Sequence, residues 1–224
     1  MKQYSFEIIV NRSNVVNSRI RISPDCRVYV TAPYGADVEG LIDSRSDWII
    51  RKISELDRLV SEYETGDGTF LFNGRMWHPV FSGSGSVNFS WPDVHYPSVE
   101  KLRKTVSKGL KEDMICRLDR YSKKMGVDYS RVSIRNQKSR WGSCSGKGNL
   151  NFNIRAMALP ETTRDYLAVH ELSHRIEMNH SSAFWKKVSE YYPEYRHAEK
   201  DLKAYWVLIG RNKIWSTLLG FQDI

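Results

Sequence analysis

Three histidines and one glutamate lie close together in the sequence at positions 170, 171, 174 and 180, within the run VHELSHRIEMNHSSAFW. His170 and His174 are four residues apart, a spacing that places two side chains one above the other on the same face of a helix. Their imidazole nitrogens can then bind one metal ion, while Glu171 lies beside them as a candidate base. The pattern predicts a zinc site with a general base next to it.

A catalytic zinc ion usually takes three protein ligands and leaves the fourth position to a water molecule, and His180 is the candidate third ligand. Because each helical residue adds about 1.5 Å of rise, a straight helix would carry His180 away from the ion. The chain must therefore leave the helix between His174 and His180. We predict the exit at residues 178–179, because Asn tolerates the left-handed conformation that ends many helices. Ser181 or Ser182 can then cap a following helix.

Two other interpretations of these residues stay open. In the first, as in a gluzincin, Glu194 or Glu199 is the third ligand, and His180 contacts a ligand and not the metal ion. Histidine nevertheless matches a metal-binding turn better. The His-Glu-x-x-His-x-x-x-x-x-His spacing is that of metzincins, but Glu177 stands where metzincins carry a glycine, so the turn must be built differently. In the second, the histidines lie in a core or on a solvated helix face without a metal.

The composition is that of an ordinary globular protein, with 41% hydrophobic and 27% charged residues among 224. No stretch approaches the roughly 18 consecutive apolar residues of a membrane span, and the first residues, MKQYSFEIIVNRSN, lack the apolar region of a signal peptide. The three cysteines include no CxxC pair, which argues against a disulfide framework and against a thiolate zinc site. We therefore expect a cytoplasmic protein without a membrane partner.

The net charge of +8 is concentrated in one region of the chain. Residues 101–155 contain 15 Lys and Arg against 4 Asp and Glu, a local excess of 11 positive charges. This segment predicts an anionic partner, plausibly DNA or another polyanion, and the alternative is a solvated helix face that serves solubility.

The elements that must position the histidines follow from the hydrophobic pattern. Three short runs, YSFEIIV, SRIRIS and RVYVTAP, predict an antiparallel meander, and Asp37 can cap a long helix that Gly66 stops. Further strands are predicted over residues 69–91, a break over residues 92–97, and a second long helix from Ser98 to Gly126.

Strands around WGSCS and NLNFN then lead directly into the helix that carries His170, and two more helices and a short tail follow. The expected fold is α+β, with a β-rich region that contains one long helix over residues 1–96. A zincin-like catalytic core follows over residues 97–209, and a C-terminal tail over residues 210–224.

Four stretches, RNQKSRWGSCS, NLNFN, YLAVHELSH and NHSSAFWKKVSEYYPEYR, resemble the YgjP-like metallopeptidases. These form a bacterial zincin family related in motif to SprT-like and WLM proteases, and the resemblance covers roughly residues 4–204. It implies zinc ligands at His170, His174 and His180 and a general base at Glu171, in agreement with the spacing. It implies little about the substrate beyond a protein or peptide.

The expected activity is zinc-dependent hydrolysis of peptide bonds, in which Glu171 takes a proton from water and returns it to the leaving amine. A different class of protein, a nucleic-acid-binding protein with a structural or vestigial zinc site, is the alternative. Glu171 argues against it, because a closed structural site needs no carboxylate beside its ligands.

Other residues can support the site. Candidate acceptors of a hydrogen bond from the ligand imidazoles are Glu190, Glu194, Glu199 and Asp201. Candidate oxyanion stabilisers are Tyr191, Tyr192, Tyr195, Arg196 and His197.

Overall fold

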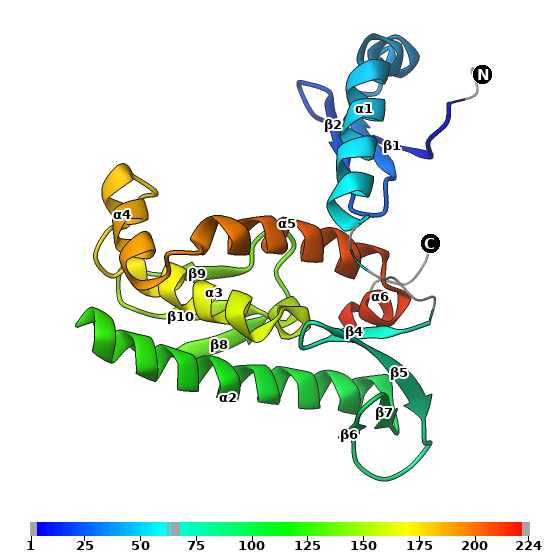
Figure 1. Cartoon of the computed structure of the whole chain (residues 1–224). Coiled ribbons are helices and arrows are strands. Elements are labelled where there is room, and N and C mark those ends of the chain that lie inside the picture. Colours follow the sequence, from blue (N-terminus) through cyan, green and yellow to red (C-terminus); the bar gives the residue numbers. More distant parts are fainter. Residues whose placement is uncertain (1–3, 62, 64–67, 221–224) are drawn as a thin grey trace. The chain divides into compact units, whose positions relative to one another are not determined.

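The computed structural model describes residues 4–61, 63 and 68–220. The chain divides into two compact units, an N-terminal unit of residues 1–64 and 206–211 and a core unit of residues 65–205 and 212–224. The expected α+β class is confirmed, because helices and three small sheets follow one another along the chain (Figure 1). The division at residue 64 differs from the expected boundary at 96, and the regions 1–96, 97–209 and 210–224 as functional domains stay a prediction.

The N-terminal unit contains β1 (Ile8–Arg12), β2 (Arg19–Ile22) and β3 (Val28–Ala32) in the order β1-β3-β2. Strand β2 pairs antiparallel with β3, but β1 pairs parallel with it, so the expected antiparallel meander is wrong. Period-two alternation identifies a strand but neither its partner nor its direction. Strand β3 has three fully buried residues and takes the centre, and the tight hairpin from β2 fills one of its edges. Strand β1 pairs with the other edge of β3.

Helix α1 (Val38–Val60) begins where the sequence predicted, because the Asp37 side chain accepts a hydrogen bond from the backbone N–H of Gly40. Its buried residues Val38, Ile42 and Ile49 join β3 in the core of this unit. The predicted stop at Gly66 lies outside the described residues.

The core unit opens with β4 (Phe70–Phe72), β5 (Arg75–Phe81), β6 (Asn88–Ser90) and β7 (Asp93–Tyr96) in the order β4-β5-β7-β6. The break predicted at residues 92–97 is wrong, because β7 is a central strand there and Val94 is fully buried. Aromatic side chains pair across these strands. The Trp77 ring packs edge-on against the rings of Phe89 and Trp91.

Helix α2 (Val99–Met125) has the predicted ends, an N-cap at Ser98 and a left-handed C-cap at Gly126. The second sheet of the unit contains β8 (Val132–Arg135), β9 (Gly142–Cys144) and β10 (Leu150–Asn153) in the order β8-β10-β9. A 3₁₀ helix (Ile154–Ala158) then connects β10 to α3 (Glu161–Ser173). The sheet thus leads into the histidine-bearing helix as the sequence predicted, but through this 3₁₀ helix and not directly.

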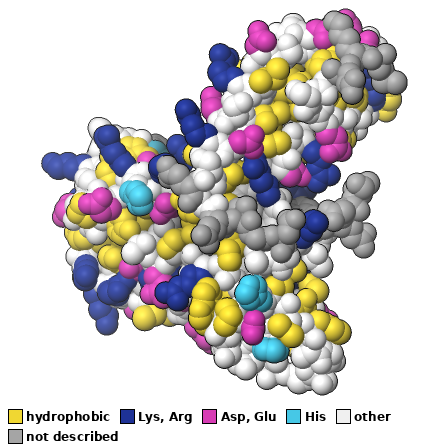
Figure 2. Space-filling model, turned by 45° about the vertical axis from the view of Figure 1, so that its right-hand side comes forward, with side chains coloured by type: hydrophobic (Ala, Val, Ile, Leu, Met, Phe, Trp, Pro, Cys, Tyr) yellow, Lys and Arg dark blue, Asp and Glu magenta, His cyan; other side chains and the backbone are white. Residues whose placement is uncertain are grey.

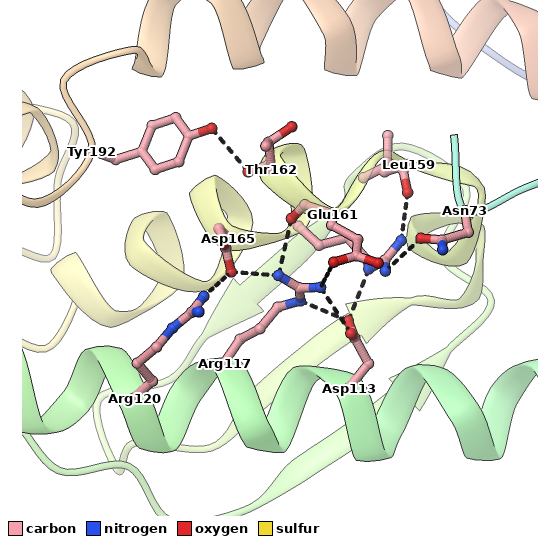
Figure 3. Close-up of polar contacts among 10 residues, drawn as sticks. Asn73, Asp113, Arg117, Arg120, Leu159, Glu161, Thr162, Asp165 and Tyr192 are labelled. Carbon is pink, nitrogen blue, oxygen red and sulfur yellow. Dashed lines mark hydrogen bonds and ion pairs between the residues drawn. The ribbon is translucent and has the colours of Figure 1, made fainter. Parts of the chain in front are cut away.

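Buried ion pairs join α2 to the first turns of α3 (Figure 3). Arg117, whose side chain is 9% exposed, lies 2.8 Å from Asp113 and 2.5 Å from Asp165. Asp113 also accepts from Arg164 at 2.8 Å, and Arg164 donates to Asn73 at 2.8 Å. Because each buried charge has an opposite partner, the network fixes α3 against α2 without leaving an unpaired ion. The helix that carries the histidines is therefore held at its N-terminal end.

Three helices end the chain: α4 (Ser182–Tyr191), α5 (Tyr195–Arg211) and α6 (Lys213–Leu219). The segment expected to be a tail thus contains a helix, and Trp215 within it is fully buried and donates to the carbonyl of Leu71 at 2.7 Å. In the part of the chain that the structure describes, no helix is both long and apolar enough to cross a membrane.

Candidate metal-binding and catalytic site

Helix α3 ends earlier than predicted, at Ser173, and His174 occupies the C-cap in a right-handed conformation. The exit expected at residues 178–179, in a left-handed conformation, is therefore wrong. The turn is closed by backbone hydrogen bonds from Ile176 and Glu177 to the carbonyl of Ser173. These hydrogen-bonded turns take the place of the glycine-dependent turn of metzincins. Glu177 therefore fits at the position where metzincins carry a glycine.

The structure brings the three histidines together. One ring nitrogen from each of His170, His174 and His180 lies within 4.8 Å of the others, and the Nε2 atoms of His170 and His180 are 3.1 Å apart. Ser181 caps α4 as predicted, by accepting from the backbone N–H of Phe184, and this fixes the chain next to His180. The Phe184 ring is fully buried and contacts all three imidazoles. A cap and an aromatic side chain thus close the cluster on one side.

Hydrogen bonds at Nδ1 orient two of the imidazoles. The Tyr166 hydroxyl lies 3.2 Å from Nδ1 of His170, and the carbonyl of Glu177 lies 3.2 Å from Nδ1 of His174. If Nδ1 carries the proton in both rings, each Nε2 keeps its lone pair for a metal ion. These partners are not among the four carboxylates considered in the sequence. Tyr166 lies one helical turn before His170, and this spacing of four residues was the signal that could have identified it.

Burial keeps the cluster neutral. Burial is the largest cause that lowers the pKa of His170 to about 3, and the neighbouring His174 and His180 contribute to the same shift. Burial also lowers the pKa of His174. Neutral imidazole is the form that binds a metal ion, so the metal-free cluster already favours the competent state at neutral pH.

Glu171 lies beside this cluster and is 4% exposed. Its Oε2 atom is buried and has no hydrogen-bond partner among the described residues. Burial raises the pKa of Glu171 to about 8, and the positive charge of Arg140 opposes this shift. The backbone of Gly142 passes so close that a Cβ atom there would lie 2.4 Å from Oε1 of Glu171. Strand β9 therefore holds this carboxylate in place by contact.

A cleft of about 510 Å³ opens in front of the histidines and Glu171. Residues 140–144, which include all of β9, form one wall, and Tyr166, Glu199 and Leu202 contribute to the other. The oxyanion stabilisers considered in the sequence do not line this cleft. Tyr192 donates its hydroxyl to the carbonyl of Thr162, and the Tyr195 ring stacks on Trp185. The cation in the cleft wall is Arg140.

Two buried polar side chains fix the loop that carries Arg140. Asn153, fully buried, donates from Nδ2 to the carbonyls of Gln137 and Arg140, both at 2.8 Å. Arg155, 7% exposed, donates to the Gln137 carbonyl at 2.9 Å and to Asn136 Oδ1 at 3.0 Å. These contacts make the loop of residues 136–140 a rigid rim of the cleft.

Comparison with known proteins gives the class and the family. Residues 16–205 match the family described as YgjP-like, metallopeptidase domain. Because the match spans most of the 224 residues, the chain belongs to the YgjP-like metallopeptidase family. No curated protein matches the chain. Among solved structures, the metallopeptidase zymogen of Pyrococcus abyssi abylysin is similar, with 27% identity over 39% of this chain and 87% of that chain, and a TM-score of 0.36.

Proposed function

We propose that the chain is a zinc-dependent metallopeptidase in which His170, His174 and His180 hold one zinc ion and Glu171 is the general base. The observation that carries this proposal is the convergence of three imidazoles beside a buried carboxylate oxygen that has no hydrogen-bond partner among the described residues. A buried carboxylate without a partner costs free energy, so its presence at this position favours a role towards a reacting group in the adjacent cleft.

The donor set fits zinc. Three neutral imidazoles leave a fourth position open, which is the pattern of catalytic zinc sites, whereas structural sites are closed and often use thiolates. The three cysteines are free, and none of them joins the histidine cluster. Glu199 lines the cleft but does not belong to the group of converging ligand atoms, which supports His180 as the third ligand. When bound, the ion would lower the pKa of a coordinated water and polarise the scissile carbonyl.

The protein's own groups would then move the protons. Glu171 would accept a proton from the attacking water and return it to the leaving amine. In the metal-free chain burial raises the pKa of Glu171 to about 8, and the positive charge of a bound zinc ion would lower it again, so that the carboxylate is ionised and can accept the proton. Arg140 would balance the negative charge that develops on the scissile carbonyl oxygen.

The substrate would lie as an extended strand along β9. This strand is an edge of its sheet, with β10 on one side and the cleft on the other. Pairing with the free edge recognises the peptide backbone and requires few side-chain contacts. Since Gly142 of β9 lies against Glu171, a peptide paired with β9 would present its backbone to the base. A protein or peptide with an unstructured segment fits this mode of binding.

Two further expectations stay predictions. One is a cytoplasmic location, for which the three free thiols are the supporting observation. The other is DNA or another polyanion as a partner of residues 101–155, whose positive charge supports an anionic ligand without identifying it.

Metal analysis tests the proposed site. The purified protein should bind one zinc ion per chain, and His180→Ala should lose stoichiometric binding at zinc concentrations that saturate the original protein. The matched control is His78→Ala, because the His78 side chain is 64% exposed and lies outside the cluster. Zinc bound in full by His180→Ala would contradict the three-histidine site and support the ligand set with Glu199 or Glu194.

A further inference from the structure

A second groove in the core unit lies between α2 and β8. Strands β8 and β9 are the two edges of the same sheet, so this groove follows the edge opposite to the proposed catalytic cleft. It has a volume of about 740 Å³. Each of its residues from α2 has others three or four positions away, so they form one face of the helix, and they are Glu100, Arg103, Lys104, Ser107, Lys108 and Lys111.

Positive charge dominates the walls of this groove. Five cations line it against one carboxylate, Glu100, and the cations are Arg103, Lys104, Lys108, Lys111 and Arg135. Lys104 pairs with Glu100 at 2.7 Å, and Lys108 lies 3.9 Å from Glu112. Arg103, Lys111 and Arg135 form no ion pair with any other residue that the structure describes. Figure 2 shows one face of the molecule, on which many Lys and Arg side chains stand out into solvent.

The opposite wall has backbone groups that are free to pair. The backbone N–H of Leu150 in β10 donates to the carbonyl of Arg131, and Leu150 and Phe152 lie opposite Val132 and Ile134 in the parallel register. In such a ladder alternate residues face the partner strand, so Val132 and Ile134 turn their own N–H and C=O groups away from β10. Residues 132–136 all line the groove, as expected of a strand that presents its edge.

We propose that this groove binds an extended acidic peptide segment of a partner protein, which adds as a strand to the free edge of β8. The backbone of the segment would pair with Val132 and Ile134, while its carboxylates would face the cations of α2 and Arg135. A groove between a helix and a strand edge is a recurrent place for an added strand, and the unpaired cations supply the preference for acidic side chains.

The geometry favours a peptide over a nucleic acid. A rigid duplex can touch the cations at the rim, but it cannot reach backbone groups inside a groove between a helix and a strand. A single nucleic-acid strand would gain most of its affinity from bases stacked on aromatic rings, and the described residues that line this groove include none. This site does not depend on the proposed peptidase activity, since it lies at the other edge of the sheet and is tested by binding alone.

The test measures the fluorescence anisotropy of a labelled ten-residue peptide of alternating Glu and Val against the full chain at low salt. Saturable binding is expected, and Arg103→Ala/Lys111→Ala should weaken it by about 5- to 10-fold, since each exposed charge pair contributes modestly. Lys123→Ala/Lys124→Ala is the matched control, because it removes the same charge from exposed positions of α2 outside the groove. The control should bind as tightly as the original chain.

A second probe separates strand addition from simple charge attraction. The same peptide with alternate backbone amides methylated keeps its charge but cannot pair as a strand, and it should bind at least about 10-fold more weakly. Equal binding of the methylated peptide would overturn the proposal. So would unchanged binding by Arg103→Ala/Lys111→Ala. A DNA duplex that displaces the peptide and binds more tightly, with the same loss in this variant, would also overturn it and would establish a nucleic-acid site instead.

Discussion

A methyl group at position 142 should disable the proposed catalytic base without touching a metal ligand. Gly142 lies in β9, and its φ is in the range open to any residue, so alanine is compatible with the backbone. An added Cβ would nevertheless lie 2.4 Å from Oε1 and 2.8 Å from Cδ of Glu171. Gly142→Ala therefore forces the carboxylate and the strand apart.

The size of the effect follows from this contact. Ordinary contacts of a Cβ atom begin at 3.4 Å, so Glu171 and β9 must separate by about 1 Å. Glu171 is buried, which leaves it little space to move. A displacement of about 1 Å at a catalytic group can reduce the rate by about 100-fold. Extra volume in a packed site also costs about 1–3 kcal/mol of the free energy of unfolding.

Hydrolysis of casein by the zinc-loaded protein measures the effect, alongside zinc content and thermal unfolding. Gly142→Ala should keep its zinc and lose about 100-fold in kcat/KM. The matched control is Gly146→Ala in the same hairpin, where an added Cβ has no atom within 4 Å, and its activity should be unchanged. Full activity in Gly142→Ala would refute the argument that β9 positions Glu171.

Three further predictions concern other parts of the core unit. Tyr166→Phe removes the hydroxyl beside Nδ1 of His170 and should weaken zinc binding by about 10- to 100-fold, measured by competition with a chelator. Arg140→Ala should lower kcat by about 100-fold and leave zinc content unchanged, as measured by casein hydrolysis. Burial alone would raise the pKa of Asp113, but Arg117 and Arg164 outweigh it and hold the pKa below its usual value. The stability from Asp113 is therefore complete above about pH 5 and is lost as the pH falls through the lowered pKa. Asp113→Asn should cost about 3–5 kcal/mol at neutral pH and should flatten the acid side of the stability profile measured by urea unfolding.

Local signals in the sequence predicted local structure well. Both ends of α2 were predicted because the caps, Ser98 and Gly126, are single residues whose role depends on the adjacent turn. The direction of β1 was predicted wrongly, as antiparallel, since it depends on which edge of β3 remained free. The strand β7 was missed because Pro92 and Pro97 mark a break locally, while pairing on both sides places Val94 in the core.

At the site too, local spacing was predictable from the sequence, and contacts between distant segments were not. Helical spacing grouped His170 and His174, and the structure places His180 with them, although the helix ends at Ser173 and not at residue 178. The contacts that orient the imidazoles and the base come from residues with no chemical signature. Tyr166 could equally have been a core residue, and Gly142 acts only through the close approach of its backbone. Such contacts depend on how β9 packs against α3, which no local pattern encodes.

The central claim is that Glu171 transfers the proton in a zinc-dependent hydrolysis, and Glu171→Gln tests it most directly. The substitution preserves the shape of the side chain and all three histidines, so zinc content should match that of the original protein, and thermal unfolding should occur at the same or a higher temperature. General-base catalysis typically contributes about 10²- to 10⁴-fold, so casein hydrolysis by the zinc-loaded variant should fall by at least about 100-fold. Hydrolysis retained in full by zinc-loaded Glu171→Gln would contradict the proposed mechanism.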